Sequence, residues 1–361
     1  MTIQKELSDI AWDVPEKVYR DDPSLSQSTL GTYERVGFNG LDHLFDKKET
    51  PSLTFGSCVD SIITGGKEEF NSRFSVLDVK ITDGGMDTVK QLLSLDLPYD
   101  KFQDIPEAVV SQAAKDVGFW KADRYDKRRY AEVLNTGNIA EYYEKCKSSD
   151  KTIITTETFQ EVMACVKALR ESAATSWLFA EDDIFSPIRR YYQLKFKLTN
   201  NGVSYRGMMD LLIVDYEKKI VYPYDLKTSS GCEWDFEEHF IQWGYNWQAR
   251  LYWRLLRANM NADPYFKDFE LKNFKFIVVN KKTLTPLVWE FPLTKEFGTL
   301  VDKEGNEYRD PFTIGEELQR YLSLRPAVPV GIEKDGVNII NCLKKKREDD
   351  NKEADSETKR S

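Results

Sequence analysis

The sequence predicts an α/β (α+β) fold in which a central mixed β-sheet is flanked by helices. Two observations lead to this prediction. Segments rich in β-branched and aromatic residues, bounded by turn residues, gather between residues 187 and 300. Segments with apolar residues at helical spacing precede them, and one long helical segment interrupts them. This order of elements is typical of a sheet that packs against helices.

The N-terminal part, residues 1–186, is predicted to be mainly helical. Ser26 or Ser28 is a candidate N-cap for a first helix. A second helix is expected in the segment FGSCVDSIIT, and Gly65-Gly66 should end it. Residues 79–150 are polar and charged with short helical patches, so we expect them to elaborate the fold.

Residues 187–300 are predicted to form the core sheet and its helix. The turn Asn200-Asn201-Gly202 separates YYQLKFKLT from VSYRGMMDLLIVD, which together predict a β-hairpin. A third strand is expected in IVYPYDLKT, and an aromatic-rich helix of about five turns follows it. FKFIVVN and PLVWEFPL then predict two more strands.

We expect residues 1–343 to form a single domain, of which 301–343 are a C-terminal extension. Residues 344–361 contain no large apolar side chain and many charges of both signs. Such a segment cannot bury enough surface to offset its ordering entropy, so it is predicted to be a disordered charged tail.

The composition restricts the location of the protein and the metals that it can bind. No apolar run approaches the ~20 residues that cross a bilayer, and the start of the chain lacks a signal-peptide pattern. We therefore expect a cytoplasmic protein without a membrane partner. The five cysteines form no C-x-x-C pair and there are only two histidines. A metal would have to rely on carboxylates, which favours Mg²⁺ or Mn²⁺.

A formal net charge of -9 argues mildly against a broad basic surface for nucleic acid. Local basic clustering is nevertheless present in residues 121–130, where basic side chains alternate with aromatic ones. The candidate DNA contacts in this segment are Arg124, Lys127, Arg128 and Arg129. A solvated helix face is the alternative interpretation.

Three charged residues on the second and third predicted strands are the candidate catalytic group. Asp225 and Lys227 point to the same side of a strand because side chains alternate. Asp210 lies on the preceding strand and can approach Asp225 across neighbouring strands. Two carboxylates can hold a cation that neutralises a phosphate and lowers the pKa of an attacking water. The lysine can orient or help to deprotonate that water.

A structural interpretation competes with this one, since a D-x14-D-x-K pattern also arises by chance as a strand-end salt bridge. The following helix adds Gln248 and Tyr252, which share one helical face and could support the acids. Alternatively, Gln248 only borders a core stripe that contains Trp243, Trp247 and Leu251.

The combined pattern resembles the PD-(D/E)XK nuclease superfamily, and within it the RecB-like branch with its Q-x-x-x-Y helix. The closest resemblance is to phage and prophage exonuclease VIII (RecE-type) enzymes. Four patches in the same order carry it: Tyr19 to Leu30; Leu53 to Asp60, with Glu69 to Phe74 after it; Lys151 to Glu157; and the Asp210, Asp225-Leu226-Lys227 and Gln248 to Tyr252 group.

The resemblance implies a PD-(D/E)XK restriction-endonuclease-like core and a Mg²⁺-dependent (or Mn²⁺-dependent) DNA exonuclease. Such enzymes degrade linear double-stranded DNA from its ends in phage recombination or DNA processing. The resemblance makes Asp210 and Asp225 metal ligands together with the backbone carbonyl of Leu226. Lys227 would be the catalytic lysine, and Gln248 and Tyr252 active-site supports.

Asp60 stands where these relatives often carry a metal-binding histidine. It is a candidate ligand, although an ordinary helix acid is an equal alternative. The resemblance also implies a single-strand annealing protein as a partner, a homo-oligomer and, if the chain is phage-encoded, the cytoplasm of a bacterial host. An endonuclease or structure-specific nuclease on the same fold, or a non-catalytic DNA-binding protein on a decayed one, are the competing hypotheses.

Overall fold

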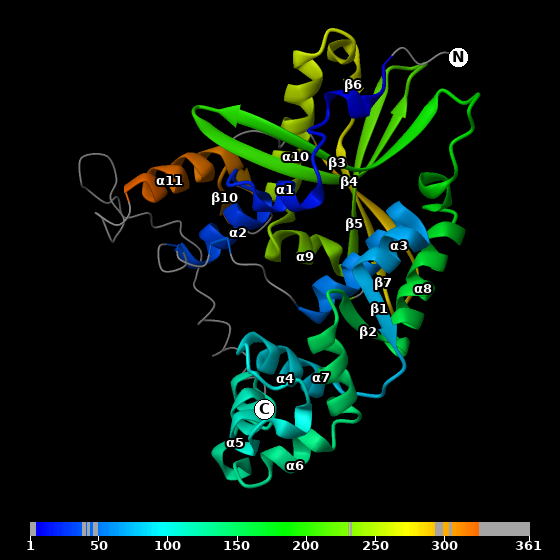
Figure 1. Cartoon of the computed structure of the whole chain (residues 1–361). Helices are drawn as coiled ribbons and strands as arrows, with labels where there is room; N and C mark the ends of the chain where they lie inside the picture. Colours follow the sequence, from blue (N-terminus) through cyan, green and yellow to red (C-terminus); the bar gives the residue numbers. More distant parts are fainter. Residues whose placement is uncertain are drawn as a thin grey trace.

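Figure 1 shows a computed structural model of the chain. The structure describes residues 5–324 except 38–40, 42–43, 46–49, 230, 232, 293–298 and 303–304. The predicted tail 344–361, and the predicted C-terminal extension past residue 324, lie outside the described residues. Within the described part of the chain, no helix is long and apolar enough to cross a membrane.

The centre of the molecule is a six-stranded sheet. Its strands are β3 (Ile188–Asn200), β4 (Val203–Asp215), β5 (Ile220–Ser229), β6 (Glu270–Leu271), β7 (Phe274–Asn280) and β8 (Leu287–Phe291). Their order is β3-β4-β5-β7-β8, with β6 paired beside β5. The sheet is mixed, because β5 runs parallel to β6 and β7 while the other neighbours are antiparallel. The predicted mixed sheet flanked by helices is confirmed.

The predicted hairpin sets the register of the first two strands. Asn201 and Gly202 both have positive φ, 48° and 78°, between the paired residues Asn200 and Val203. Positive φ at both central residues of a two-residue loop is the type I′ arrangement, whose twist matches that of the strands. Counting back from this turn places Asp210 across from residue 193 of β3.

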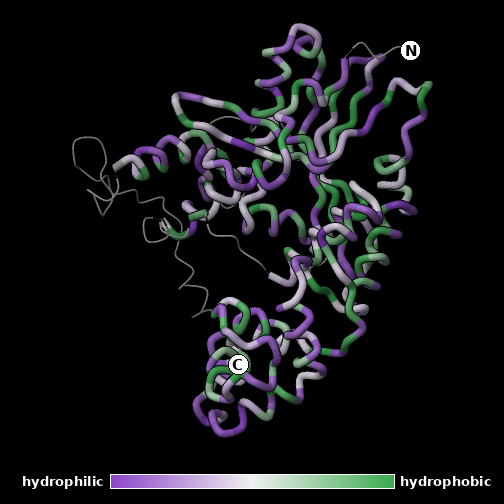
Figure 2. The backbone as a smooth tube through the Cα atoms, in the orientation of Figure 1, coloured by the Kyte–Doolittle hydropathy of each residue, from purple (hydrophilic) through white to green (hydrophobic). Residues whose placement is uncertain are grey.

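Helices cover both faces of this sheet. One face packs against α3 (Pro51–Arg73) and α8 (Thr156–Glu171). The other packs against α2 (Gln27–Val36), α10 (Tyr245–Ala262) and α11 (Pro311–Leu324). The short helices α1 (Glu16–Asp21) and α9 (Phe236–Gln242) lie beside α2 and α10. Hydrophobic stretches run along strands of the sheet, while hydrophobic and hydrophilic residues alternate along the helices (Figure 2).

Two N-terminal expectations can be compared with the structure. Ser26 caps α2, since its side chain accepts a hydrogen bond of 3.3 Å from the Thr29 N–H. Gly65-Gly66 interrupts the helix as predicted: the backbone leaves the helical region at Gly66, where φ is 70°. A second helical segment, which was not predicted, follows at once and continues to Arg73. Glycine permits this kink because it adopts positive φ without a steric penalty.

Residues 79–150 form a lobe at one end of the molecule, at the bottom of Figure 1. Its helices are α4 (Asp83–Ser94), α5 (Glu107–Asp116), α6 (Arg129–Leu134) and α7 (Ile139–Ser148). They enclose an apolar cluster of their own. The chain enters and leaves through β1 (Phe74–Leu77) and β2 (Thr152–Thr155), which pair in parallel.

Several short elements complete the described structure. They are 3-10 turns at Leu7–Ile10, Phe102–Asp104, Asp123–Tyr125, Ser176–Phe179, Glu233–Asp235 and Phe266–Asp268, and the strands β9 (Leu300–Val301) and β10 (Glu307–Tyr308).

Candidate active site

The two candidate aspartates lie where neighbouring strands separate. The last paired residues of β4 and β5 are Leu211 and Tyr224. Asp210 and Asp225 occupy the next position of the ladder, where the two strands are no longer paired. Beyond that point β4 pairs only with β3, and β5 continues along β7. Backbone groups that face the resulting gap are released from the ladder and become available to other partners. We call this place the split.

Asp225 is the most buried acid at the split, with 2% of its surface exposed. Its Oδ1 accepts a 2.5 Å hydrogen bond from Gln248 Nε2, and its Oδ2 lies 2.5 Å from Lys227 Nζ. Apart from this ion pair, Oδ2 has no hydrogen-bond partner within the described structure. The ring of Tyr245 lies 4.8 Å from Lys227 Nζ. A buried carboxylate with one under-satisfied oxygen is suited to bind a further cation.

Asp210 is half-buried on the other side of the split. Its Oδ2 accepts a 2.8 Å hydrogen bond from the Leu226 N–H. The N–H and C=O of one strand residue point to the same side, so the Leu226 carbonyl faces the split as well. The structure therefore brings Asp210, Asp225 and Lys227 together with the carbonyl that the sequence resemblance implied.

Asp60 approaches the split from α3. A Cβ at Gly56 would lie 3.0 Å from Thr228 Oγ1, so this glycine permits the helix to pack closely on β5. Asp60 is one turn further along the same helical face. Both of its carboxylate oxygens lie 2.9 Å from Gln193 Nε2 of β3, which donates to them. Asp60 is therefore half-buried and bonded, unlike an ordinary exposed helix acid.

The crowding of acids at the split changes their proton affinities. Burial raises the pKa of Asp60 to about 7; Arg73 opposes this rise, Asp225 adds to it and the Gln193 amide opposes it. Burial raises the pKa of Asp210 well above its ordinary value, and Asp225 and Asp60 raise it further. The charged forms of Asp60 and Asp210 are therefore disfavoured in this place, and a nearby positive charge would favour them.

Lys227 responds in the opposite direction. Burial alone would lower its pKa, but Asp225, Tyr245 and Asp210 together raise that pKa above the ordinary value. The lysine is therefore a firmly protonated ammonium beside Asp225, and its chemistry here is that of a hydrogen-bond donor and a positive charge.

The Q-x-x-x-Y pair lies on the face of α10 that covers the split. Gln248 is buried and bonded to Asp225, so it does more than border the core stripe. Tyr252 is 9% exposed and packs against β4, where a Cβ at Gly207 would meet its ring at 2.8 Å. Burial raises the pKa of Tyr252 well above 10, with Tyr19, Asp225 and Asp210 adding to the rise. It is a neutral phenol near the acids.

Sequence reasoning missed two residues of this site. Tyr245 precedes Gln248 by three positions and so shares its helical face, a signal that was available. Gln193 could have been found by counting back from the Asn201-Gly202 turn to the position across from Asp210.

The oxygen atoms at the split fit a hard divalent cation, although the side chains alone do not supply all of its ligands. Among the described residues, no three His, Cys, Asp or Glu side chains are arranged as a ready-made metal site. Mg²⁺ commonly takes one or two carboxylates, keeps several waters and binds substrate phosphate. Asp210, Asp225 and the Leu226 carbonyl match that demand, and Asp225 Oδ2 is buried with the Lys227 ammonium beside it.

The candidate DNA contacts lie away from the split, on the lobe. Arg124, Lys127 and Arg128 are exposed. Arg129 differs, because its side chain is 4% exposed and its guanidinium binds Asp126 and the backbone carbonyls of Trp120 and Ala122. Its contacts fit a structural role within the lobe.

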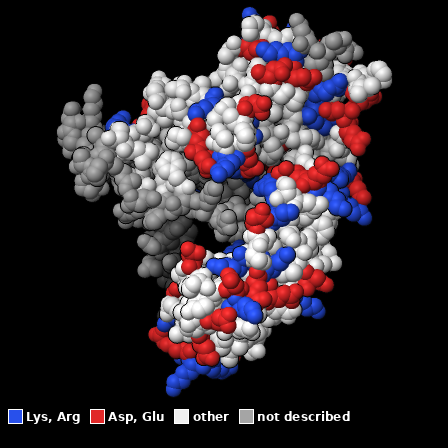
Figure 3. All heavy atoms as spheres, in the orientation of Figure 1, with Lys and Arg blue, Asp and Glu red and all other residues white. Residues whose placement is uncertain are grey.

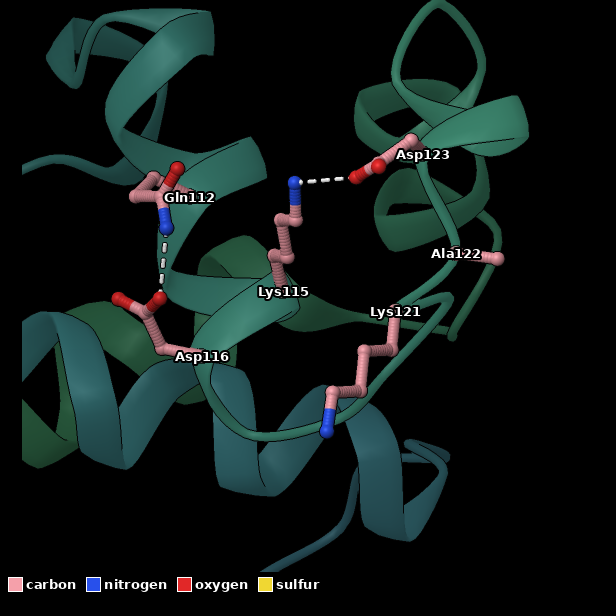
Figure 4. Close-up of a pocket in the computed structure, with 6 residues that line it drawn as sticks. All are labelled: Gln112, Lys115, Asp116, Lys121, Ala122 and Asp123. Atoms are coloured by element: carbon pink, nitrogen blue, oxygen red, sulfur yellow. Dashed lines mark hydrogen bonds and ion pairs between the residues drawn. The ribbon is translucent and has the colours of Figure 1, made fainter.

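A hollow on the lobe is lined mainly by polar and charged residues, four of which bond to one another in two pairs (Figure 4). Lys115 Nζ lies 2.7 Å from Asp123 Oδ1, and Gln112 donates a 2.6 Å hydrogen bond to Asp116. The hollow contains none of the acids of the split and is not a second candidate for them.

Comparisons with known proteins give little independent guidance. No protein-family model matches the chain, and no curated protein is significantly similar to it. Among solved structures, a crystal structure of a candidate exonuclease from Eubacterium rectale is similar over 92% of each chain, with 14% identity and a TM-score of 0.44. A similarity of this size supports no inference about activity.

Proposed function

We propose that this chain is a Mg²⁺-dependent deoxyribonuclease that hydrolyses phosphodiester bonds. The observation that supports it most directly is the split, where two aspartates, a lysine and a backbone carbonyl meet. The exonuclease activity on linear duplex DNA, and membership of the PD-(D/E)XK superfamily, rest on the sequence resemblance to RecE-type enzymes.

Each residue at the split has a role in this proposal. Asp210, Asp225 and the Leu226 carbonyl would hold Mg²⁺, which when bound neutralises phosphate charge and acidifies a nearby water. Gln248 bonds one oxygen of Asp225, and the other oxygen, which pairs with Lys227, would be the one to bind the metal. Lys227 orients the attacking water and offsets the negative charge that develops on the phosphate.

The proposed partners follow from the same hypothesis. DNA is the substrate, and exposed Arg124, Lys127 and Arg128 of the lobe could contact its phosphates. A single-strand annealing protein, a homo-oligomer and a cytoplasmic location remain proposals that rest on the resemblance alone.

The test compares the wild type with Asp225→Ala and Lys227→Ala on end-labelled linear duplexes and on covalently closed circular plasmid, with Mg²⁺ or with EDTA. We expect the wild type to degrade only the linear DNA, and only with Mg²⁺. Both variants should lose about 100-fold or more in rate, since each removes a group that acts on the reacting phosphate or its metal.

Lys115→Ala is the matched control, because Lys115 also pairs with an aspartate, at 2.7 Å, but on the lobe. It should cleave like the wild type. Equal rates for the wild type and the two variants of the split would show that the site is misassigned. Cutting of the closed circle would favour the endonuclease alternative.

A further inference from the structure

Gln193 has a backbone conformation that is unusual inside a strand. Its φ is 55°, in the left-handed region that side chains other than glycine rarely adopt. The residue lies in the middle of β3, between the paired positions 192 and 194. Strain of this kind is found where the surrounding structure needs a side chain in one particular place.

The conformation of Gln193 coincides with a reversal of the side-chain alternation in two strands. On β3, Tyr192 packs toward α3 and α8, yet Leu194 packs toward α10. On β4, Met209 packs toward α10, yet Leu211 packs toward α3 and α8. Residues two apart normally share a face. The reversal therefore occurs in the row of Gln193 and Asp210, at the edge of the split.

The amide of Gln193 uses this conformation to reach another element. Its Nε2 lies 2.9 Å from both oxygens of Asp60 on α3. Gln193 thus holds the carboxylate of Asp60, which approaches from α3 on one face of the sheet. Gln248 holds the carboxylate of Asp225 from α10, on the opposite face. Asp60 and Asp225 therefore each accept hydrogen bonds from one glutamine side chain, which fixes the orientation of the carboxylate.

We propose that Gln193 is a positioning residue of the metal site, which holds the Asp60 carboxylate toward the split so that Asp60 can complete the ligand set. The inference rests on the proposed function and deepens it. An amide donor leaves a lone pair of each oxygen free, so Asp60 can give one oxygen to the metal while the other stays bonded to Gln193. Partners of this kind typically change metal affinity about 10–100-fold when removed.

The test measures Mn²⁺ binding in the absence of DNA, from the loss of the free-ion electron paramagnetic resonance signal. Gln193→Met keeps the length of the side chain and removes the donor. Gln193→Gly also removes the donor but relieves the positive φ, so it should fold at least as well as the wild type. We expect both variants to need about 10-fold more Mn²⁺ for half-saturation.

Gln112→Met is the matched control, since Gln112 also bonds an aspartate but lies on the lobe. Its Mn²⁺ midpoint should equal that of the wild type. If Gln193→Met and Gln193→Gly also bind Mn²⁺ as the wild type does, the inference is wrong and Gln193 serves only the shape of the strand.

A double-mutant cycle tests whether Gln193 acts through Asp60. In an Asp60→Asn background, Gln193→Met should cause no further loss of Mn²⁺ affinity. A loss of the same size in both backgrounds would overturn the inference while leaving the proposed nuclease intact. If the wild type neither binds Mn²⁺ nor cleaves DNA, the proposed function fails and the inference fails with it.

Discussion

The split and the lobe both place basic side chains beside carboxylates, but only on the lobe do the opposite charges balance. On the lobe, Lys115 lies between Asp123 and Asp126, and the buried Arg129 also binds Asp126. Charges of both signs intermingle over this part of the surface (Figure 3). At the split, Lys227 pairs with one carboxylate, that of Asp225, and the hydrogen bonds to Asp60 and Asp210 in the described structure come from neutral donors.

The two regions therefore differ in whether their charges neutralise one another. The lobe neutralises its own charges, so its ion pairs need no ligand to be stable. The split concentrates negative charge in a half-buried place, which disfavours the metal-free protein. A metal site requires an arrangement that is unfavourable until a cation binds. Whether removal of one acid stabilises or destabilises the metal-free protein can be measured.

The largest expected contrast comes from removing one acid in each region. Asp210→Asn should reduce cleavage about 100-fold or more, because the proposed metal site would lose a ligand. The same change should stabilise the metal-free protein, because it relieves the repulsion between ionised Asp210 and Asp225 and Asp60. Urea unfolding in EDTA measures the second effect.

Asp126→Asn on the lobe should behave in the opposite way. The buried Arg129 loses a charged partner at 2.7 Å, so stability should fall by roughly 1 kcal/mol while the cleavage rate is unchanged. If both substitutions destabilise the protein equally, the distinction between the two regions does not hold.

The pH dependence of stability should differ between the regions as well. The folded-state pKa of Asp60 is about 7, above its unfolded value of about 3.9. The folded protein then binds more protons between these values, so its stability falls as pH rises from about 4 to about 7. Thermal melts in EDTA should therefore give a higher Tm at pH 5 than at pH 8.

Two comparisons isolate this effect. Asp60→Asn should flatten the pH dependence, and Mg²⁺ should raise the Tm most at pH 8, where the acids are ionised. On the lobe, the hydrogen bond from Lys115 lowers the pKa of Asp123, so its contribution is lost only below about pH 4. A Tm in EDTA that rises steadily from pH 5 to pH 8 would contradict the assignment of Asp60.

The strand pattern and the hairpin turn were sufficient to predict five strands of the sheet and its hairpin, but not β6 or the order of the strands. The Asn201-Gly202 turn has the sequence of a type I′ turn, and alternation identified the strands on either side of it. Local signals were enough here because they agree with the tertiary structure. The Gly65-Gly66 pair marked where the helical backbone is interrupted, but it could not show that a second helical segment follows at once, since a glycine that ends a helix and one that kinks it have the same local preference.

The site was only partly predictable for a geometric reason. Asp225 and Lys227 follow from the two-residue period of a strand, and Gln248 from the period of a helix. The separation of β4 from β5, which opens the split, depends on β7 pairing with β5 across a long connection. Neither this pairing nor the positive φ of Gln193 is encoded in a local pattern, so the environment of Asp60 required the structure.

The basic segment of the lobe provides the smallest expected effect. Arg124 stacks on Tyr125, with its guanidinium 4.7 Å from the ring, and Arg128 already pairs with Glu132 at 2.9 Å. Neutralising Arg124, Lys127 and Arg128 to glutamine should lower the salt dependence of DNA binding by at most about 3 in log–log slope, since each phosphate contact contributes roughly 0.9. Prior pairing of Arg128 should make the observed change smaller. Binding measured from low to moderate salt checks this, and an unchanged slope would assign the segment, like Arg129, to the structure of the lobe.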